Sequence, residues 1–201
     1  MDSKTIAFIT MMGALGNVLF LISYYLGPIA EGVALDLSLI PTFVSALYGG
    51  PLAGFVTGLF VGVLPGIFFG PLGSGSWLGL ISLPIGKSLT GLTAGLFYKD
   101  LDINSRNRRS ILTIPLVLVS YVPECLFTVA YFLSFLPYFF GLPYSIAVTI
   151  IVSVLLKAWA EIIFMSFLMG ALVGNQGFSN FVNNFFARPN NWSKALAPPL
   201  T

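Results

Sequence analysis

Long apolar segments separated by short turns dominate this chain and limit what it can fold into. The first runs from Ile6 to Leu26, about 20 residues, which at 1.5 Å per residue is enough to cross a bilayer. Only 8% of the 201 residues are charged, against about 25% in an ordinary soluble domain. Lipid must therefore surround much of the protein. Because the segments are continuously apolar and do not alternate with polar residues, we expect helices and not a barrel.

The turns between these segments predict an all-α membrane protein with six transmembrane helices. Glycine and proline mark most of the breaks, and the one long polar linker is Lys99–Ser110. The helices form one predicted domain over residues 1–174, and a polar cytoplasmic tail follows over residues 175–201. The predicted helices are Thr5–Leu26, Leu35–Tyr48, Leu52–Phe68, Leu80–Tyr98, Ile111–Ser134 and Tyr144–Val173.

The distribution of basic residues predicts the orientation in the membrane. With six spans, both termini and the long linker lie on the same side. That side holds seven Lys and Arg residues, whereas the opposite loops hold none. Cytoplasmic loops are enriched in such residues, so we expect a protein of the cell membrane with both termini in the cytoplasm. The seven are Lys4, Lys99, Arg106, Arg108, Arg109, Arg188 and Lys194.

The composition also argues against several classes of function. The chain has no histidine, the commonest general base and metal ligand, so we expect no cofactor and no enzymatic activity. Its net charge of +2 gives no indication of nucleic-acid binding. No phosphate-binding Gly-x-x-x-x-Gly-Lys-Ser/Thr loop is present. If ATP drives this protein, another subunit must hydrolyse it.

Ionisable side chains inside the predicted spans indicate a binding site. Such groups cost about 2.5–3.5 kcal/mol each on insertion scales and commonly mark sites or pathways. Counting from the outer ends of their helices, Lys87 lies about 10 Å deep, Glu124 about 15 Å and Lys157 about 20 Å. We therefore expect them to meet in one cavity that opens outward. The predicted substrate-binding residues are Glu31, Lys87, Glu124, Tyr131, Lys157 and Glu161.

The same charges also permit a purely structural interpretation, in which they neutralise each other and hold the helices together. Lys157 and Glu161 are spaced to pair on one helix face. Asp36 is predicted to cap the second helix by accepting backbone N–H groups of its first turn. Most aromatic residues near the outer edge fit an interfacial belt, and the remainder are available to stack on a planar ligand.

Small residues predict where helices approach each other closely. Gly54, Gly58 and Gly62 form one such face, and Gly91 and Gly95 form another on the next helix. We expect these two faces to pack together within the chain. A weaker stripe on the first helix is a candidate contact for another membrane subunit; it consists of Ala7, Thr10 and Ala14.

The segment from the second to the third helix resembles a known family. The runs Asp36-Leu-Ser-Leu-Ile-Pro41 and Gly49-Gly-Pro51-Leu-Ala-Gly54 resemble those of the substrate-binding S components of energy-coupling factor (ECF) vitamin transporters, and most of all the riboflavin-type member. The resemblance covers roughly Thr5–Val173. It implies an S-component-like bundle that binds a vitamin in an outward-facing cavity. It also implies that the first helix binds a transmembrane coupling subunit, which two ATPase subunits drive.

Individual positions of that family can be compared with this chain. Lys157 matches a lysine that lies at the ligand, and Tyr131 lies in a stretch that resembles the family's Asn-Tyr-Phe. Ala130 and Val154 stand where the riboflavin-type pattern has asparagines that would hydrogen-bond a heteroaromatic ring. Glu124 and Glu161 would supply different polar contacts and favour a ligand with more donor groups or a positive charge.

Riboflavin uptake is the leading expectation, and two other functions remain open. Six helices with buried charges are compatible with a stand-alone secondary transporter, although the sequence lacks the inverted repeats that many of them show. An intramembrane enzyme is the third alternative. The absence of histidine excludes a Ser-His protease, but Ser153 and Lys157 leave a Ser-Lys pair conceivable.

Overall fold

The computed structural model is helical throughout the part of the chain that it describes, residues 1–26, 36–72, 77–103, 108–141 and 143–186. None of these residues lies in a strand, which confirms the prediction of an all-α protein. The helices in these ranges are α1 (Ser3–Leu26), α2 (Leu39–Gly49), α3 (Pro51–Phe69), α4 (Leu78–Asp100), α5 (Arg109–Ser120), α6 (Val122–Phe140), α7 (Tyr144–Gly174) and α8 (Gln176–Phe186).

Five helical segments among the described residues are long and apolar enough to cross a membrane. They are α1, α3, α4, α7 and the combined α5–α6 segment. The chain is therefore a multi-pass membrane protein. Six full spans are not confirmed, because α2 has only 11 residues and is about 16 Å long. That is short of the hydrocarbon core, which is about 30 Å thick.

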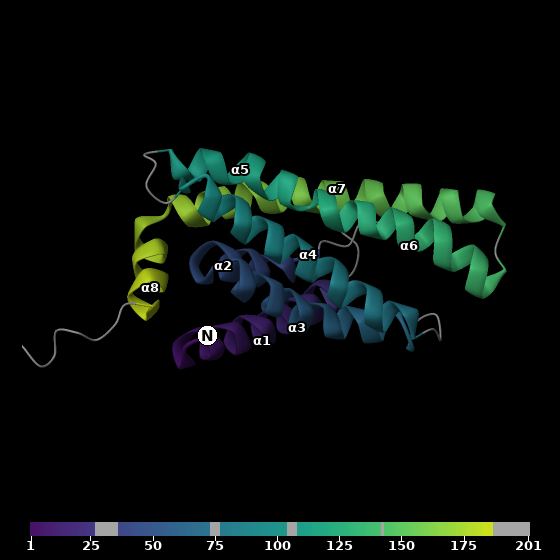
Figure 1. Ribbon diagram of the computed structural model, residues 1–201, viewed down its shortest axis with the longest axis horizontal. Helices are drawn as coiled ribbons and strands as arrows, with labels where there is room; N and C mark the ends of the chain where they lie inside the picture. The colour runs from purple at the N-terminus through teal and green to yellow at the C-terminus, as the bar shows by residue number, and fades with distance from the viewer. Residues whose placement is uncertain (27–35, 73–76, 104–107, 142, 187–201) are drawn as a thin grey trace, which may run out of the picture.

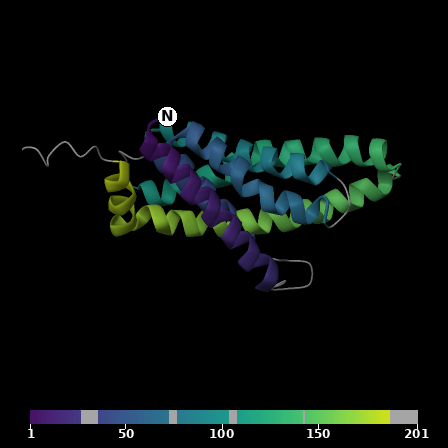
Figure 2. The same cartoon turned by 90° about the horizontal axis from the view of Figure 1, so that it is seen from below.

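The helices form an elongated bundle with α4 near its centre (Figure 1). Helices α5, α6 and α7 lie on one side of α4, and α1, α2 and α3 lie on the other (Figure 1). Helix α1 crosses the bundle obliquely, as the second view shows (Figure 2). This arrangement brings α4 into contact with both halves of the molecule, so its side chains can join them.

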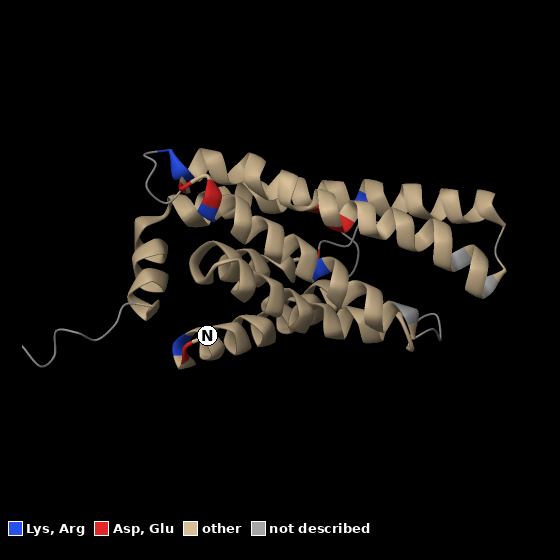
Figure 3. Cartoon of the chain, viewed as in Figure 1, with Lys and Arg blue, Asp and Glu red and all other residues tan. Residues whose placement is uncertain are grey.

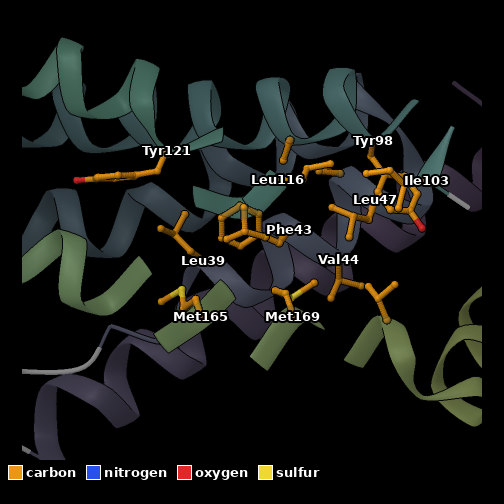
Figure 4. Packing of buried hydrophobic residues seen from close by; sticks show 14 of the residues in the cluster. Leu39, Phe43, Val44, Leu47, Tyr98, Ile103, Leu116, Tyr121, Met165 and Met169 are labelled. Atoms are coloured by element: carbon orange, nitrogen blue, oxygen red, sulfur yellow. The ribbon is translucent and has the colours of Figure 1, made fainter. Parts of the chain in front are cut away.

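Helix α2 is short but lies at the centre of the apolar core. Its Phe43 is completely buried (Figure 4). Around it pack Leu39 from the same helix, Leu116 from α5 and the α7 residues Met165 and Met169 (Figure 4). Because protein on several sides covers α2, its position is set by packing and not by lipid.

The predicted fifth helix, Ile111–Ser134, is divided into α5 and α6. Pro123 lies in the first turn of α6. It has no N–H to donate to the carbonyl four residues earlier. The Ser120 carbonyl at this break accepts a hydrogen bond from the Thr93 hydroxyl of α4 at 2.7 Å. The break therefore connects α4 to the point where α6 begins.

Part of the predicted polar tail forms α8, which lies across the end of the bundle where the chain begins (Figure 1). Its Phe185 and Phe186 rings lie 5.5 and 4.8 Å from the Phe8 ring of α1, centroid to centroid. The hydroxyl groups of Ser179 and Tyr48 are 2.8 Å apart. Helix α8 thus packs on both α1 and α2.

The glycine faces of α3 and α4 pack against each other, as predicted. A Cβ atom added at Gly58 would lie 2.7 Å from the Lys87 carbonyl carbon, and one at Gly95 would lie 2.5 Å from Pro51 Cα. A Cβ at Gly91 would collide with the Gly54 carbonyl. The missing side chain at Gly58 therefore lets the backbone of α4 approach at the turn that carries Lys87.

We predict that Gly58→Ala lowers the free energy of unfolding by about 1–3 kcal/mol, the usual range for overpacking. The new methyl group meets backbone atoms of Lys87, which cannot rotate away. Thermal unfolding of the purified protein in detergent measures the effect. Gly177→Ala is the matched control, because its Cβ meets only the Asn175 side chain, at 3.2 Å. Equal unfolding temperatures for the two variants would contradict the prediction.

Candidate functional site

Ionisable side chains from four separate segments meet inside the bundle. They come from the residues before α2, from α4, from α6 and from α7. Figure 3 shows charged residues of α4, α6 and α7 midway along the bundle, well separated from the charged group at the end where the chain begins. We call this set the interior cluster; it consists of Asp36, Lys87, Glu124, Lys157 and Glu161.

Lys87 is the best-enclosed cation of the cluster, with 5% of its side chain exposed. Its Nζ donates hydrogen bonds to Asp36 Oδ2 at 2.8 Å and to Ser38 Oγ at 2.6 Å. The other oxygen of Asp36, Oδ1, accepts the backbone N–H of Ser38 at 2.9 Å. Asp36 therefore orders the start of α2, close to the capping role predicted for it, and also neutralises Lys87.

Lys157 and Glu161 form the second ion pair of the cluster. Lys157 Nζ lies 3.7 Å from Glu161 Oε1, which confirms the pairing predicted from their spacing. This distance is longer than a good hydrogen bond, and 34% of the Lys157 side chain is exposed. Glu161 Oε1 also accepts the backbone N–H of Asp36 at 3.3 Å. The two ion pairs are thus joined through Asp36.

Glu124 is the third carboxylate of the cluster and lies in the first turn of α6. It is buried and accepts a hydrogen bond from the Thr90 hydroxyl of α4. Gly86 leaves room for it, because a Cβ there would lie 3.3 Å from Glu124 Cγ. Within the described part of the chain, no Lys or Arg forms a salt bridge with Glu124. Glu124 therefore lacks the salt-bridge partner that the other two carboxylates have.

The remaining predicted binding residues are placed differently. Tyr131 lies two turns beyond Glu124 on α6, where it interacts with Ser82 of α4. Glu31 lies outside the residues that the structure describes. The predicted coupling residues Ala7, Thr10 and Ala14 are all exposed on α1.

Asp36, Ser38 and Thr90 belong to this site although none was among the predicted binding residues. A buried lysine needs a counter-ion, and Asp36, predicted to cap the second helix, is the nearest carboxylate. The spacing from Lys87 to Thr90 is three residues, which places both on neighbouring positions of α4. The pairing itself joins residues 51 positions apart, so no local pattern indicates it.

The arrangement offers hydrogen-bond acceptors and charged groups. The Ser153 hydroxyl donates to the Thr149 carbonyl at 3.2 Å and is exposed, which gives no support to a Ser-Lys pair. Among the described residues, no three His, Cys, Asp or Glu side chains are grouped as a metal site. Comparisons of this chain with protein-family models, curated protein sequences and solved structures found no match.

We predict that Lys87→Met lowers the free energy of unfolding by about 3 kcal/mol, because it leaves the Asp36 carboxylate without its cation. Adding Asp36→Asn to this variant should recover part of the loss by removing the unpaired charge. Thermal unfolding of the four proteins in a double-mutant cycle measures the coupling. Lys99→Met, at an exposed position, is the control. Equal losses for the Lys87 and Lys99 variants would refute the importance of this pair.

Proposed function

We propose that this protein is the substrate-binding subunit of an importer for a vitamin or a similar small molecule. In this proposal it works as an ECF S component in the cell membrane, with an ATP-driven coupling module. The observation that carries the proposal is the interior cluster, in which Glu124 is buried without a salt bridge among the described residues. The fold and the family resemblance are consistent with it.

The lack of a salt bridge to Glu124 among the described residues favours ligand binding over simple charge neutralisation. If the cluster served only to hold helices together, each carboxylate would be expected to have a cation, because an unpaired buried charge is strongly destabilising. Asp36 and Glu161 meet this expectation, whereas Glu124, within the described ranges, has a hydrogen bond from the Thr90 hydroxyl and no salt bridge. Ionisable groups at membrane depth commonly mark a site or a pathway.

The positions of the basic residues support the proposed orientation. The start of α1, the end of α4 and the start of α5 lie at the same end of the bundle (Figure 1). Basic residues gather there (Figure 3), among them Lys4, Lys99, Arg108 and Arg109. We assign this end to the cytoplasm by the enrichment of basic residues on that side of membranes. The opposite end would then admit the ligand from outside.

The exposed small residues of α1 support the proposed contact with a coupling subunit. Ala7, Thr10 and Ala14 point away from the bundle, whereas Phe8 and Gly13 beside them are buried. Small exposed residues allow another transmembrane helix to approach closely. The coupling subunit and its two ATPases would supply the energy for transport, which the interior cluster cannot.

We predict that the protein purified gently from its native membrane retains one small molecule per chain. Riboflavin is the identity that the family resemblance implies, because Lys157 and Tyr131 match positions of the riboflavin-type pattern. Absorbance and mass spectrometry of the released molecule measure this, and a yellow flavin spectrum would identify riboflavin. Accumulation of a solute in vesicles that contain this protein alone would instead favour a secondary transporter.

We predict that Ala14→Trp weakens association with the coupling subunit at least about tenfold, equivalent to about 1.4 kcal/mol. The bulky ring would keep a partner helix from approaching α1. The amount of coupling subunit retained by the tagged chain measures the effect, and ligand binding should stay unchanged. Ala160→Trp places the same side chain at an exposed position of α7 and serves as the control. Equal retention for both variants would refute the proposed contact face.

A further inference from the structure

Aromatic rings form a continuous stack along one face of α6. Phe127, Tyr131, Phe135 and Phe139 follow each other at intervals of four residues. Their successive ring centroids are 6.2, 5.2 and 5.6 Å apart, and the ring planes differ by only 26°, 22° and 5°. Phe135 and Phe139 at the far end are exposed, whereas Phe127 and Tyr131 are partly buried. We call these four residues the aromatic ladder.

Glu124 lies at the N-terminal end of the aromatic ladder on α6. At 3.6 residues per turn, Glu124 lies on the same stripe of α6, at the inner end of the ladder. Two small residues of α4 contact this stripe, since Ser82 interacts with Tyr131 and Gly86 packs beside Glu124. Ser82, Gly86 and Thr90 are spaced by four residues on α4. The contact between the two helices therefore brings flat rings, small side chains and one buried carboxylate together.

The charges of the interior cluster do not balance among the described residues. It holds three carboxylates, Asp36, Glu124 and Glu161, against the two ammonium groups of Lys87 and Lys157. Lys87 is engaged by Asp36 and Ser38, and Lys157 lies nearest to Glu161. With all five groups ionised, one carboxylate is left without a salt bridge among the described residues, and it is Glu124. A carboxylate can accept about four hydrogen bonds, and Thr90 supplies one.

We infer that Glu124 and the aromatic ladder bind a ligand that carries a positively charged nitrogen on a flat aromatic ring. The inference rests on the proposed capture function and specifies the class of its substrate. The charged nitrogen would complete the hydrogen bonding of Glu124, since N–H groups bond strongly to carboxylates. The ring would stack along the ladder, whose electron-rich faces also attract cations. Such a ligand differs from riboflavin, which is uncharged at neutral pH, so retention of riboflavin on purification would contradict this inference and leave the capture function intact.

Two matched comparisons test this with the purified full-length protein, freed of retained ligand and reconstituted in nanodiscs. Pyridoxamine and pyridoxine share a ring and differ in an ammonium against a hydroxyl group. Benzylamine and benzyl alcohol differ in the same way on a plain benzene ring. Equilibrium dialysis should show the cationic member of at least one pair binding at least about tenfold more tightly, as expected for a hydrogen bond to a charged group.

Variants show whether Glu124 causes the preference. Glu124→Gln keeps the shape and hydrogen bonding of a neutral acid but loses the charge, so it should abolish the preference for the cation. Glu161→Gln is the matched control and should retain it, since Glu161 already has Lys157. If Glu124→Gln fails to fold, the ligand pairs still test the preference for a cation, because they are measured on the unmodified protein.

Several outcomes would overturn the inference. Equal or tighter binding of the neutral member in both pairs would do so, as would an unchanged preference in Glu124→Gln. Failure of both cations to bind the unmodified protein would also overturn it. The proposed capture function would survive each of these results if the protein still retained a molecule on purification. It would fail only if neither a retained molecule nor any ligand binding were found.

Discussion

The ion pair between Lys87 and Asp36 is the interaction on which the arrangement of the bundle depends. It joins α4 to the residues before α2 across 51 positions of sequence. The close approach of α3, permitted by Gly58, brings the Lys87 backbone to this position. Asp36 in turn orders Ser38 at the start of α2. A helix too short to span the membrane is thereby held inside the bundle by charge at one end and by the Phe43 core along its length.

Polar bonds extend from this pair to the other half of the molecule. Glu161 of α7 accepts the Asp36 backbone N–H, and Thr90 of α4 bonds to Glu124 of α6. These contacts form a network inside lipid, where each unsatisfied polar group costs several kcal/mol. The helices α4, α6 and α7 and the start of α2 are therefore coupled at one level. A change at Glu124 would be transmitted to α4 through Thr90.

The sequence predicts the features that depend on local pattern. Hydropathy indicates the long helices, four-residue spacing indicates the pair of Lys157 and Glu161, and glycine spacing indicates the contact of α3 with α4. Features that depend on tertiary contacts are missed. Nothing local shows that α2 is only 11 residues long or that Asp36 neutralises Lys87. Pro123 lies at the break after Tyr121, but Pro115 lies inside α5 without dividing it, so proline alone does not predict the break. These features are decided by which segments the fold brings together.

The break between α5 and α6 explains how the chain tolerates Glu124. It places this residue in the first turn of α6, where the free N–H groups of a helix stabilise a negative charge by about 0.3–1 kcal/mol at exposed sites. This gain is small beside the several kcal/mol that a buried charge costs in proteins. The helix terminus and Thr90 therefore reduce the need for a counter-charge without removing it. Because the same break starts the stripe that carries the aromatic ladder, it joins the uncompensated carboxylate to the flat rings.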